Sequence, residues 1–160
     1  MSMLEAKHLL GLENISKADI QDLINTAYKF KEVLDRPIKK VPSLTGKHCV
    51  NMFYENSTRT RISFELAEKR LSADITNFSA STSSVKKGES LKDTIQNLNA
   101  MKLDCVVMRH PAPGSCFALT KYIDAVIINA GDGTHEHPTQ GLLDILSLHE
   151  HFNGKLKSKN

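Results

Sequence analysis

The chain has 160 residues, of which 40% are hydrophobic and 24% are charged, and these values are ordinary for one globular domain. Its formal net charge is +3, from 21 Lys and Arg against 18 Asp and Glu, which excludes a strongly basic nucleic-acid surface. No apolar run has the length of a membrane span, and no signal core opens the chain. The three cysteines lack metal-ligand spacing. We therefore expect a cytoplasmic protein with no nucleic-acid or membrane partner.

The hydrophobic pattern alternates between helical spacing and short apolar runs. Ser16 and Asp19 have the spacing of a capping box, and apolar residues then recur at helical intervals as far as Pro37. The pattern predicts four strands, over 47–54, 74–78, 103–108 and 124–129. It also predicts five helices: one before Pro37, one from Ser57 to about Leu71, one after Ser90, a short one over 114–119 and a last one from Pro138.

This alternation of strands and helices predicts the fold class. Two of the strands are apolar along nearly their whole length, which is typical of strands buried on both faces of a parallel sheet. We expect an α/β fold with three layers, α/β/α, around a four-stranded parallel sheet in the strand order 2-1-3-4.

The junction between the first strand and its helix is rich in anion-binding groups. Residues 57–61 read Ser-Thr-Arg-Thr-Arg, which places three hydroxyls and two guanidinium groups at a helix start. The free N–H groups and the dipole at such a start favour an anion, and guanidinium binds phosphate through a planar fork. The alternative is that Ser57 or Thr58 merely caps the helix and the arginines are solvated. The density of donors favours a phosphate cradle.

Basic and polar residues follow the other predicted strands as well. Lys86 and Lys87 come after the second strand, Arg109 and His110 after the third, and residues 135–140 after the fourth. In an open parallel sheet, ligands bind outside the carboxyl ends of the strands. This convergence indicates a small, multiply charged anion as the ligand.

A second helix start repeats this design. His137 precedes a proline at the first helical position, and the helix N-terminus is expected to lower the pKa of His137 and favour its neutral ring. Gln140, one turn later, is placed to meet an amide of the ligand. Two His-Glu-His triplets suggest a metal, but His149 and His151 diverge on a helix, so we expect an exposed helix end and no metal site.

Four segments, in order, resemble the aspartate and ornithine transcarbamoylases. They are residues 53–65 (FYENSTRTRISFE), 83–90 (SSVKKGES), 108–111 (MRHP) and 137–140 (HPTQ). Three features resemble the aspartate branch. They are the Lys-Lys-Gly-Glu-Ser block, the Glu55-Asn56 pair and Thr139, a position at which ornithine enzymes typically carry Cys.

Catalytic chains of this family are about twice as long. The resemblance therefore implies that residues 1–150 form the carbamoyl phosphate-binding domain, and that residues 151–160 begin the crossing to an aspartate-binding domain outside this sequence.

The resemblance also implies residue roles. His137, Arg109 and Thr60 would be catalytic, with Arg109 bridging the phosphate and the carbonyl oxygen. Ser83 and Lys87 would reach a neighbouring subunit's site in a homotrimer. The residues that would bind carbamoyl phosphate are Ser57, Thr58, Arg59, Thr60, Arg109, His137 and Gln140. Arg61 is expected to be structural.

The reaction implied is attack of the L-aspartate amine on carbamoyl phosphate, which needs no cofactor and serves pyrimidine biosynthesis. A regulatory chain or a dihydroorotase would be possible partners. Two alternatives stay open: a non-catalytic module that binds phosphate or carbamoyl phosphate, and an ornithine-type enzyme. A dinucleotide-binding domain is not indicated, because no GxGxxG motif follows the first strand.

Overall fold

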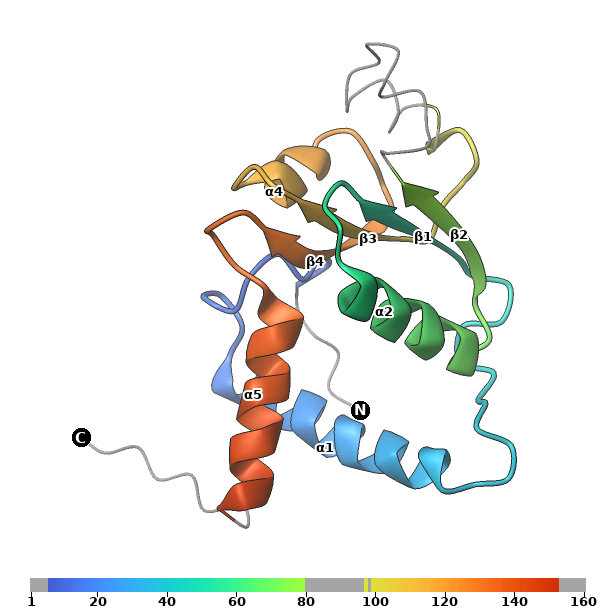
Figure 1. Cartoon of the computed structure of the whole chain (residues 1–160), viewed down its shortest axis with the longest axis vertical. Helices are drawn as coiled ribbons and strands as arrows, with labels where there is room; N and C mark the ends of the chain where they lie inside the picture. The colour runs from blue at the N-terminus through green and yellow to red at the C-terminus, as the bar shows by residue number, and fades with distance from the viewer. Residues whose placement is uncertain (1–5, 80–96, 98, 153–160) are drawn as a thin grey trace, which may run out of the picture.

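The computed structural model describes residues 6–79, 97 and 99–152. Its elements, in chain order, are α1 (Lys17–Leu34), β1 (His48–Phe53), α2 (Thr58–Arg70), β2 (Asp74–Ser79), β3 (Cys105–His110), α4 (Ser115–Leu119), β4 (Val126–Asp132) and α5 (Pro138–His151) (Figure 1). The helix predicted after Ser90 lies outside the described residues. Within the described ranges, no helix combines the length and apolarity that crossing a membrane requires.

The four strands form one parallel sheet in the order β2-β1-β3-β4, which confirms the prediction. The strand β1 lies between β2 and β3, so its carboxyl end opens at the middle of the sheet edge. A short N-terminal segment extends the sheet beside β4, because Leu9 N donates to Ile127 O at 2.8 Å and Asn129 N donates to Leu9 O at 2.9 Å.

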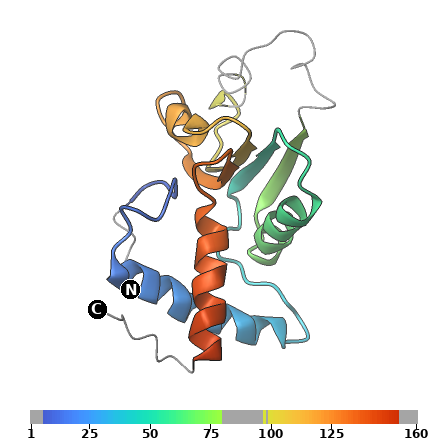
Figure 2. The same ribbon diagram turned by 60° about the vertical axis from the view of Figure 1, so that its left-hand side comes forward.

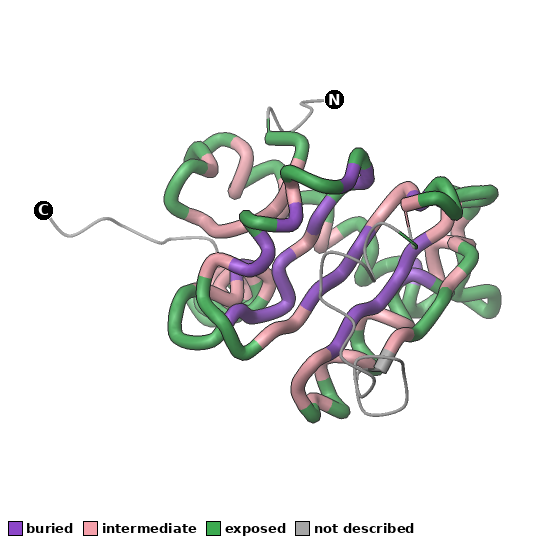
Figure 3. The backbone as a smooth tube through the Cα atoms, turned by 90° about the horizontal axis from the view of Figure 1, so that it is seen from above, coloured by how far each residue is buried: buried purple, intermediate pink, exposed green. Residues whose placement is uncertain are grey.

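Helices cover both faces of the sheet, as the predicted three layers require. On one face, α4 packs over β3 and β4, and Met52, Met108 and Ile127 are fully buried there. On the other face, α2 packs over β1 and β2, and Phe64 contacts a second buried cluster. Figure 3 shows that the buried backbone is concentrated in the central strands. The strong burial on both faces explains why these strands are almost continuously apolar.

The third and fourth strands differ from the prediction at both ends, and the fourth covers Val126–Asp132 where 124–129 was predicted. The third strand begins at Cys105 and not at Leu103, because the Asp104 carboxylate accepts a hydrogen bond from the His48 backbone N–H at 2.9 Å and ends the preceding turn. It then runs on through His110, which pairs with Asp132 across a bulge. The ladder therefore carries Arg109 inside a strand, where it lies at a fixed position relative to β1 and β4.

The first helix begins as predicted. The Ser16 hydroxyl accepts a hydrogen bond from Asp19 N at 3.1 Å and donates to its carboxylate at 2.7 Å. Downstream, α1 packs across α5 (Figure 2), where Tyr28 Oη lies 2.9 Å from His149 Nδ1. The expectation of an exposed helix end therefore holds for His151 but is wrong for His149, which is half-buried against Tyr28.

Candidate functional site

Two helices begin side by side above the carboxyl ends of the strands. Ser57 is the N-cap of α2, and His137 is the N-cap of α5 with Pro138 directly after it. Neither side chain makes a capping hydrogen bond to its helix in this structure. The interpretation of Ser57 as a simple helix cap is therefore not supported, and the first-turn N–H groups keep their donor capacity.

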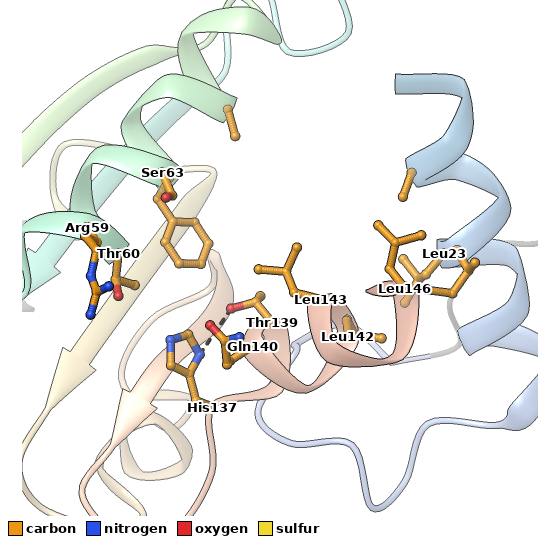
Figure 4. A pocket seen from close by; sticks show the side chains of 14 residues that line it. Leu23, Arg59, Thr60, Ser63, His137, Thr139, Gln140, Leu142, Leu143 and Leu146 are labelled. Atoms are coloured by element: carbon orange, nitrogen blue, oxygen red, sulfur yellow. Dashed lines mark hydrogen bonds between the residues drawn. The ribbon is translucent and has the colours of Figure 1, made fainter. Parts of the chain in front are cut away.

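A cavity of about 760 Å³ lies between α1, α2 and α5 (Figure 4). One end is polar and brings together predicted residues from both helix starts, namely Arg59, Thr60, His137 and Gln140. The other end is apolar, with leucines of α5 facing Leu23 of α1. Residues nearly 80 positions apart in sequence thus share one polar wall.

The remaining cradle residues line a separate, smaller cavity of about 120 Å³. Ser57 and Thr58 lie there together with Arg61 and Glu55. The structure therefore divides six of the seven predicted carbamoyl phosphate-binding residues between two cavities, and Arg109 is not among the lining residues of either. It also places Arg61, which was expected to be structural, beside two of the predicted phosphate-binding hydroxyls.

Arg109 is held by protein groups on two sides. Its Nε donates to Glu55 Oε2 at 3.1 Å, and its Nη1 donates to the Ala130 carbonyl at 3.1 Å. The residue after Ala130 is Gly131, whose φ is +114°, and a Cβ atom there would lie 2.8 Å from Arg109 Nη1 and 3.6 Å from His137 Cδ2. A side chain at this position would therefore crowd the guanidinium group and contact the imidazole ring.

His137 has the lowered pKa that the sequence predicts, but the dominant cause differs. Burial lowers the pKa of His137 first, and the positive charge of Arg109 lowers it further. The ring is therefore neutral at pH 7, and its Nδ1 lies 3.2 Å from Thr139 Oγ1. When Nδ1 accepts the threonine hydroxyl, the tautomer leaves Nε2–H as a donor for a ligand oxygen.

Gln140 points its amide nitrogen along the helix. Nε2 donates to Asp144 Oδ1 at 2.9 Å, which leaves the carbonyl oxygen of Gln140 as an acceptor. An acceptor at this position suits an NH2 group on a ligand. Ser83 and Lys87, the other predicted site residues, lie outside the described residues.

A buried carboxylate that the sequence analysis missed fixes the loop before His137. Asp132, which is 1% exposed, accepts hydrogen bonds from Asn129 Nδ2 and Gly114 N at 2.8 Å each, and from Glu136 N at 3.2 Å. Although burial opposes its charge, these bonds hold the pKa of Asp132 below its usual value. A short Gly-Asp-Gly signal in the sequence marks a turn but does not identify this role.

The family model for the aspartate/ornithine carbamoyltransferase carbamoyl phosphate-binding domain matches residues 7–150. The chain belongs to this family. It is 60% identical over 154 residues to the aspartate carbamoyltransferase catalytic subunit of Cytophaga hutchinsonii. This match covers 96% of this chain and 50% of that protein. It is 62% identical over 149 residues to the Christiangramia forsetii subunit, covering 93% of this chain and 48% of that protein.

Solved structures of transcarbamoylases have the same fold. Aspartate transcarbamoylase from Trypanosoma cruzi, in complex with carbamoyl phosphate and aspartate, superposes with a TM-score of 0.86 at 37% identity, over 94% of this chain and 49% of that chain. The catalytic subunit from M. jannaschii superposes with a TM-score of 0.82 at 42% identity, over 92% and 48%. The chain thus spans about half the length of these transcarbamoylases, and it matches their carbamoyl phosphate-binding domain.

Proposed function

We propose that this chain is the carbamoyl phosphate-binding half of an aspartate carbamoyltransferase catalytic chain. The observation that carries the proposal is the single polar wall on which Arg59 and Thr60 of α2 meet His137 and Gln140 of α5. These side chains offer donors for phosphate, a donor for a carbonyl oxygen and an acceptor for an amide NH2. Carbamoyl phosphate carries these three groups on one small molecule.

Each group of the ligand has a matching protein group. Phosphate would lie at the start of α2, where Arg59 supplies a charged donor next to free backbone N–H groups. The carbonyl oxygen would accept from Nε2 of neutral His137, with the Thr60 hydroxyl beside it. The NH2 group would donate to the carbonyl oxygen of Gln140, which its bond to Asp144 leaves available.

In the reaction, the aspartate amine would attack the carbonyl carbon and phosphate would leave. The charge that develops on the carbonyl oxygen would be stabilised by His137 and Thr60, and by Arg109 once Arg109 leaves Glu55. This chemistry depends on positioning and electrostatics and uses no covalent intermediate.

The described residues offer groups for carbamoyl phosphate, whereas the aspartate site and the assembly are proposals. Two carboxylates need further cations, which we propose come from a second domain that also covers the apolar end of the large cavity. Several points stay predictions. They are a homotrimer in which Ser83 and Lys87 serve a neighbouring site, a regulatory or dihydroorotase partner, a role in pyrimidine biosynthesis and a cytoplasmic location.

A binding-only role for these 160 residues on their own is the second candidate, because Arg59 is the one Lys or Arg among the described residues that line the large cavity, and aspartate carries two carboxylates. Without a covering domain, water in the cleft would screen the electrostatic stabilisation of the transition state. The test is a pair of measurements on the 160-residue chain: competition between carbamoyl phosphate and inorganic phosphate, and formation of carbamoyl aspartate at saturating substrates.

We expect saturable binding and negligible turnover. Turnover at the rate of a complete transcarbamoylase would show that the half-enzyme interpretation is wrong. If no phosphate-bearing ligand bound, the interpretation of residues 57–61 as a phosphate-binding site would be wrong.

A further inference from the structure

Two cysteines lie opposite each other on neighbouring strands, away from the proposed ligand site. Cys49 of β1 and Cys105 of β3 are register partners in the parallel sheet, so their side chains leave the same face. Paired strands lie about 4.8 Å apart, which is within the Cα separation that disulfides span. The two thiols share a hydrogen bond, and neither is part of a disulfide.

A second cavity, of about 510 Å³, reaches both thiols. Its walls are mostly apolar and come from α2, the loop after it and the sheet, including Phe64, Leu71 and Val107. A small uncharged molecule can enter such a space with little loss of hydration, whereas a charged molecule would lose more of its hydration against the apolar walls.

Three charged residues line the same cavity, namely Lys47, Asp104 and Glu68, and of these Glu68 is buried. Glu68 is 6% exposed and lines the cavity, and its Oε2 accepts from Asn51 Nδ2 at 2.8 Å. Its Oε1 is buried and has no hydrogen-bond partner among the described residues. An unpartnered buried acceptor is costly unless something donates to it, so the cavity offers a docking point for a small donor.

The two thiols differ in reactivity. The hydrogen bond with Cys105 lowers the pKa of Cys49, which favours its thiolate, the nucleophilic form. The same bond, together with burial, raises the pKa of Cys105. Cys116 is different: it lies in the core on the other face of the sheet, and burial raises its pKa to about 12.

We propose that Cys49 and Cys105 form a dithiol modification site that hydrogen peroxide converts to a disulfide. Peroxide is small and uncharged, and it can donate a hydrogen bond to Glu68 Oε1. The Cys49 thiolate attacks one peroxide oxygen, forming a sulfenic acid and releasing hydroxide, which takes up a proton to become water. The Cys105 sulfur then attacks the sulfenic sulfur, and a second water leaves with the thiol proton. In sum, two thiols and one peroxide give one disulfide and two waters.

The test treats the reduced, folded 160-residue chain with hydrogen peroxide, then denatures and alkylates it for mass spectrometry. We expect two of the three thiols to be lost, a linked Cys49–Cys105 peptide, and full recovery of the thiols with dithiothreitol. Circular dichroism before and after treatment verifies that the chain stays folded.

Variants separate this pair from general oxidation. Cys116→Ser should form the crosslink at a rate within about twofold of the parent chain, since Cys116 takes no part. Cys105→Ser should form no internal disulfide. Disulfides that include Cys116, or equal oxidation of all three thiols in the folded chain, would overturn the proposal, and so would persistence of both free thiols after oxidation.

Discussion

The Glu55 carboxylate lies 3.1 Å from Nε of Arg109 and neutralises the cation that the proposed ligand needs. Both side chains are partly exposed, at 26% for Arg109 and 36% for Glu55, so the pair is worth about 0.2–1 kcal/mol. A phosphate ligand must displace this carboxylate or bind beside its negative charge. Glu55 therefore competes with an anion for the same guanidinium group.

Replacing Glu55 by Gln should strengthen phosphate binding by this chain. Removal of the competing charge predicts a gain of about two- to fivefold in affinity, measured by titration calorimetry. Glu150→Gln is the matched control, because it removes one negative charge from a surface pair with Lys31 far along α5. Equal gains in both variants would mean that net charge, and not release of Arg109, controls binding.

Arg59 and Arg61 line different cavities, so substitutions can separate their contributions to phosphate binding. Arg59→Ala should weaken phosphate binding by one to two decades, because a charged, bidentate contact contributes about 1.5–3 kcal/mol. Arg61→Ala should cost less if the ligand occupies the larger cavity beside His137. The same calorimetric titration compares them, and a larger loss for Arg61 would place the phosphate in the small cavity with Ser57 and Thr58.

Gly131→Ala should damage both the fold and the site. Its φ of +114° is strained for any residue with a side chain, and the new Cβ would lie 2.8 Å from Arg109 Nη1. We expect a loss of about 1–3 kcal/mol in the free energy of unfolding, and weaker phosphate binding. Gly46→Ala is the control: its φ is +74°, but no atom lies within 4 Å of the added Cβ.

The control variant should lose about 1–2 kcal/mol of stability and keep its affinity for phosphate. Urea unfolding and phosphate titration on both variants separate backbone strain from contact with Arg109. A Gly131→Ala chain with unchanged phosphate affinity would show that Arg109 does not depend on this glycine.

Three partly buried histidines predict how stability depends on pH. Burial lowers the pKa of His137, His110 and His8 below the ordinary value of 6.5. Below that pH the unfolded chain takes up protons that the folded chain resists, so the free energy of unfolding should fall as the pH drops from about 6.5. Urea unfolding between pH 5 and 8 measures this slope, and His137→Gln should make it shallower. A slope unaffected by His137→Gln would assign the effect to the other two rings.

Much of the fold follows from local chemistry. The capping pair Ser16 and Asp19 and the apolar runs suffice to predict the helix starts and the parallel sheet, because each signal lies within a few residues. The strand ends shifted because partners distant in sequence decide them: Asp104 holds the His48 backbone, and His110 pairs with Asp132.

The sequence names the donors of the proposed site but not the protein groups that they contact. Arg59, His137 and Gln140 stand in motifs that indicate their chemistry directly. The pairing of Glu55 with Arg109 joins residues 54 positions apart, and the Asp132 network depends on a loop conformation. No periodicity in the sequence carries such information, since these contacts exist only after β1, β3 and β4 are assembled.

The most direct test of the proposed function maps the ligand onto the backbone. Carbamoyl phosphate and inorganic phosphate are titrated separately into ¹⁵N-labelled chain, and amide shifts are followed by NMR. We predict saturable shifts at residues 57–61, 109, 137, 139 and 140 with both ligands. Carbamoyl phosphate should shift His137 and Gln140 further, because only this ligand carries the carbonyl and NH2 groups. Identical shifts from the two ligands at these residues, or saturable shifts confined to other surfaces, would contradict the proposed carbamoyl phosphate site.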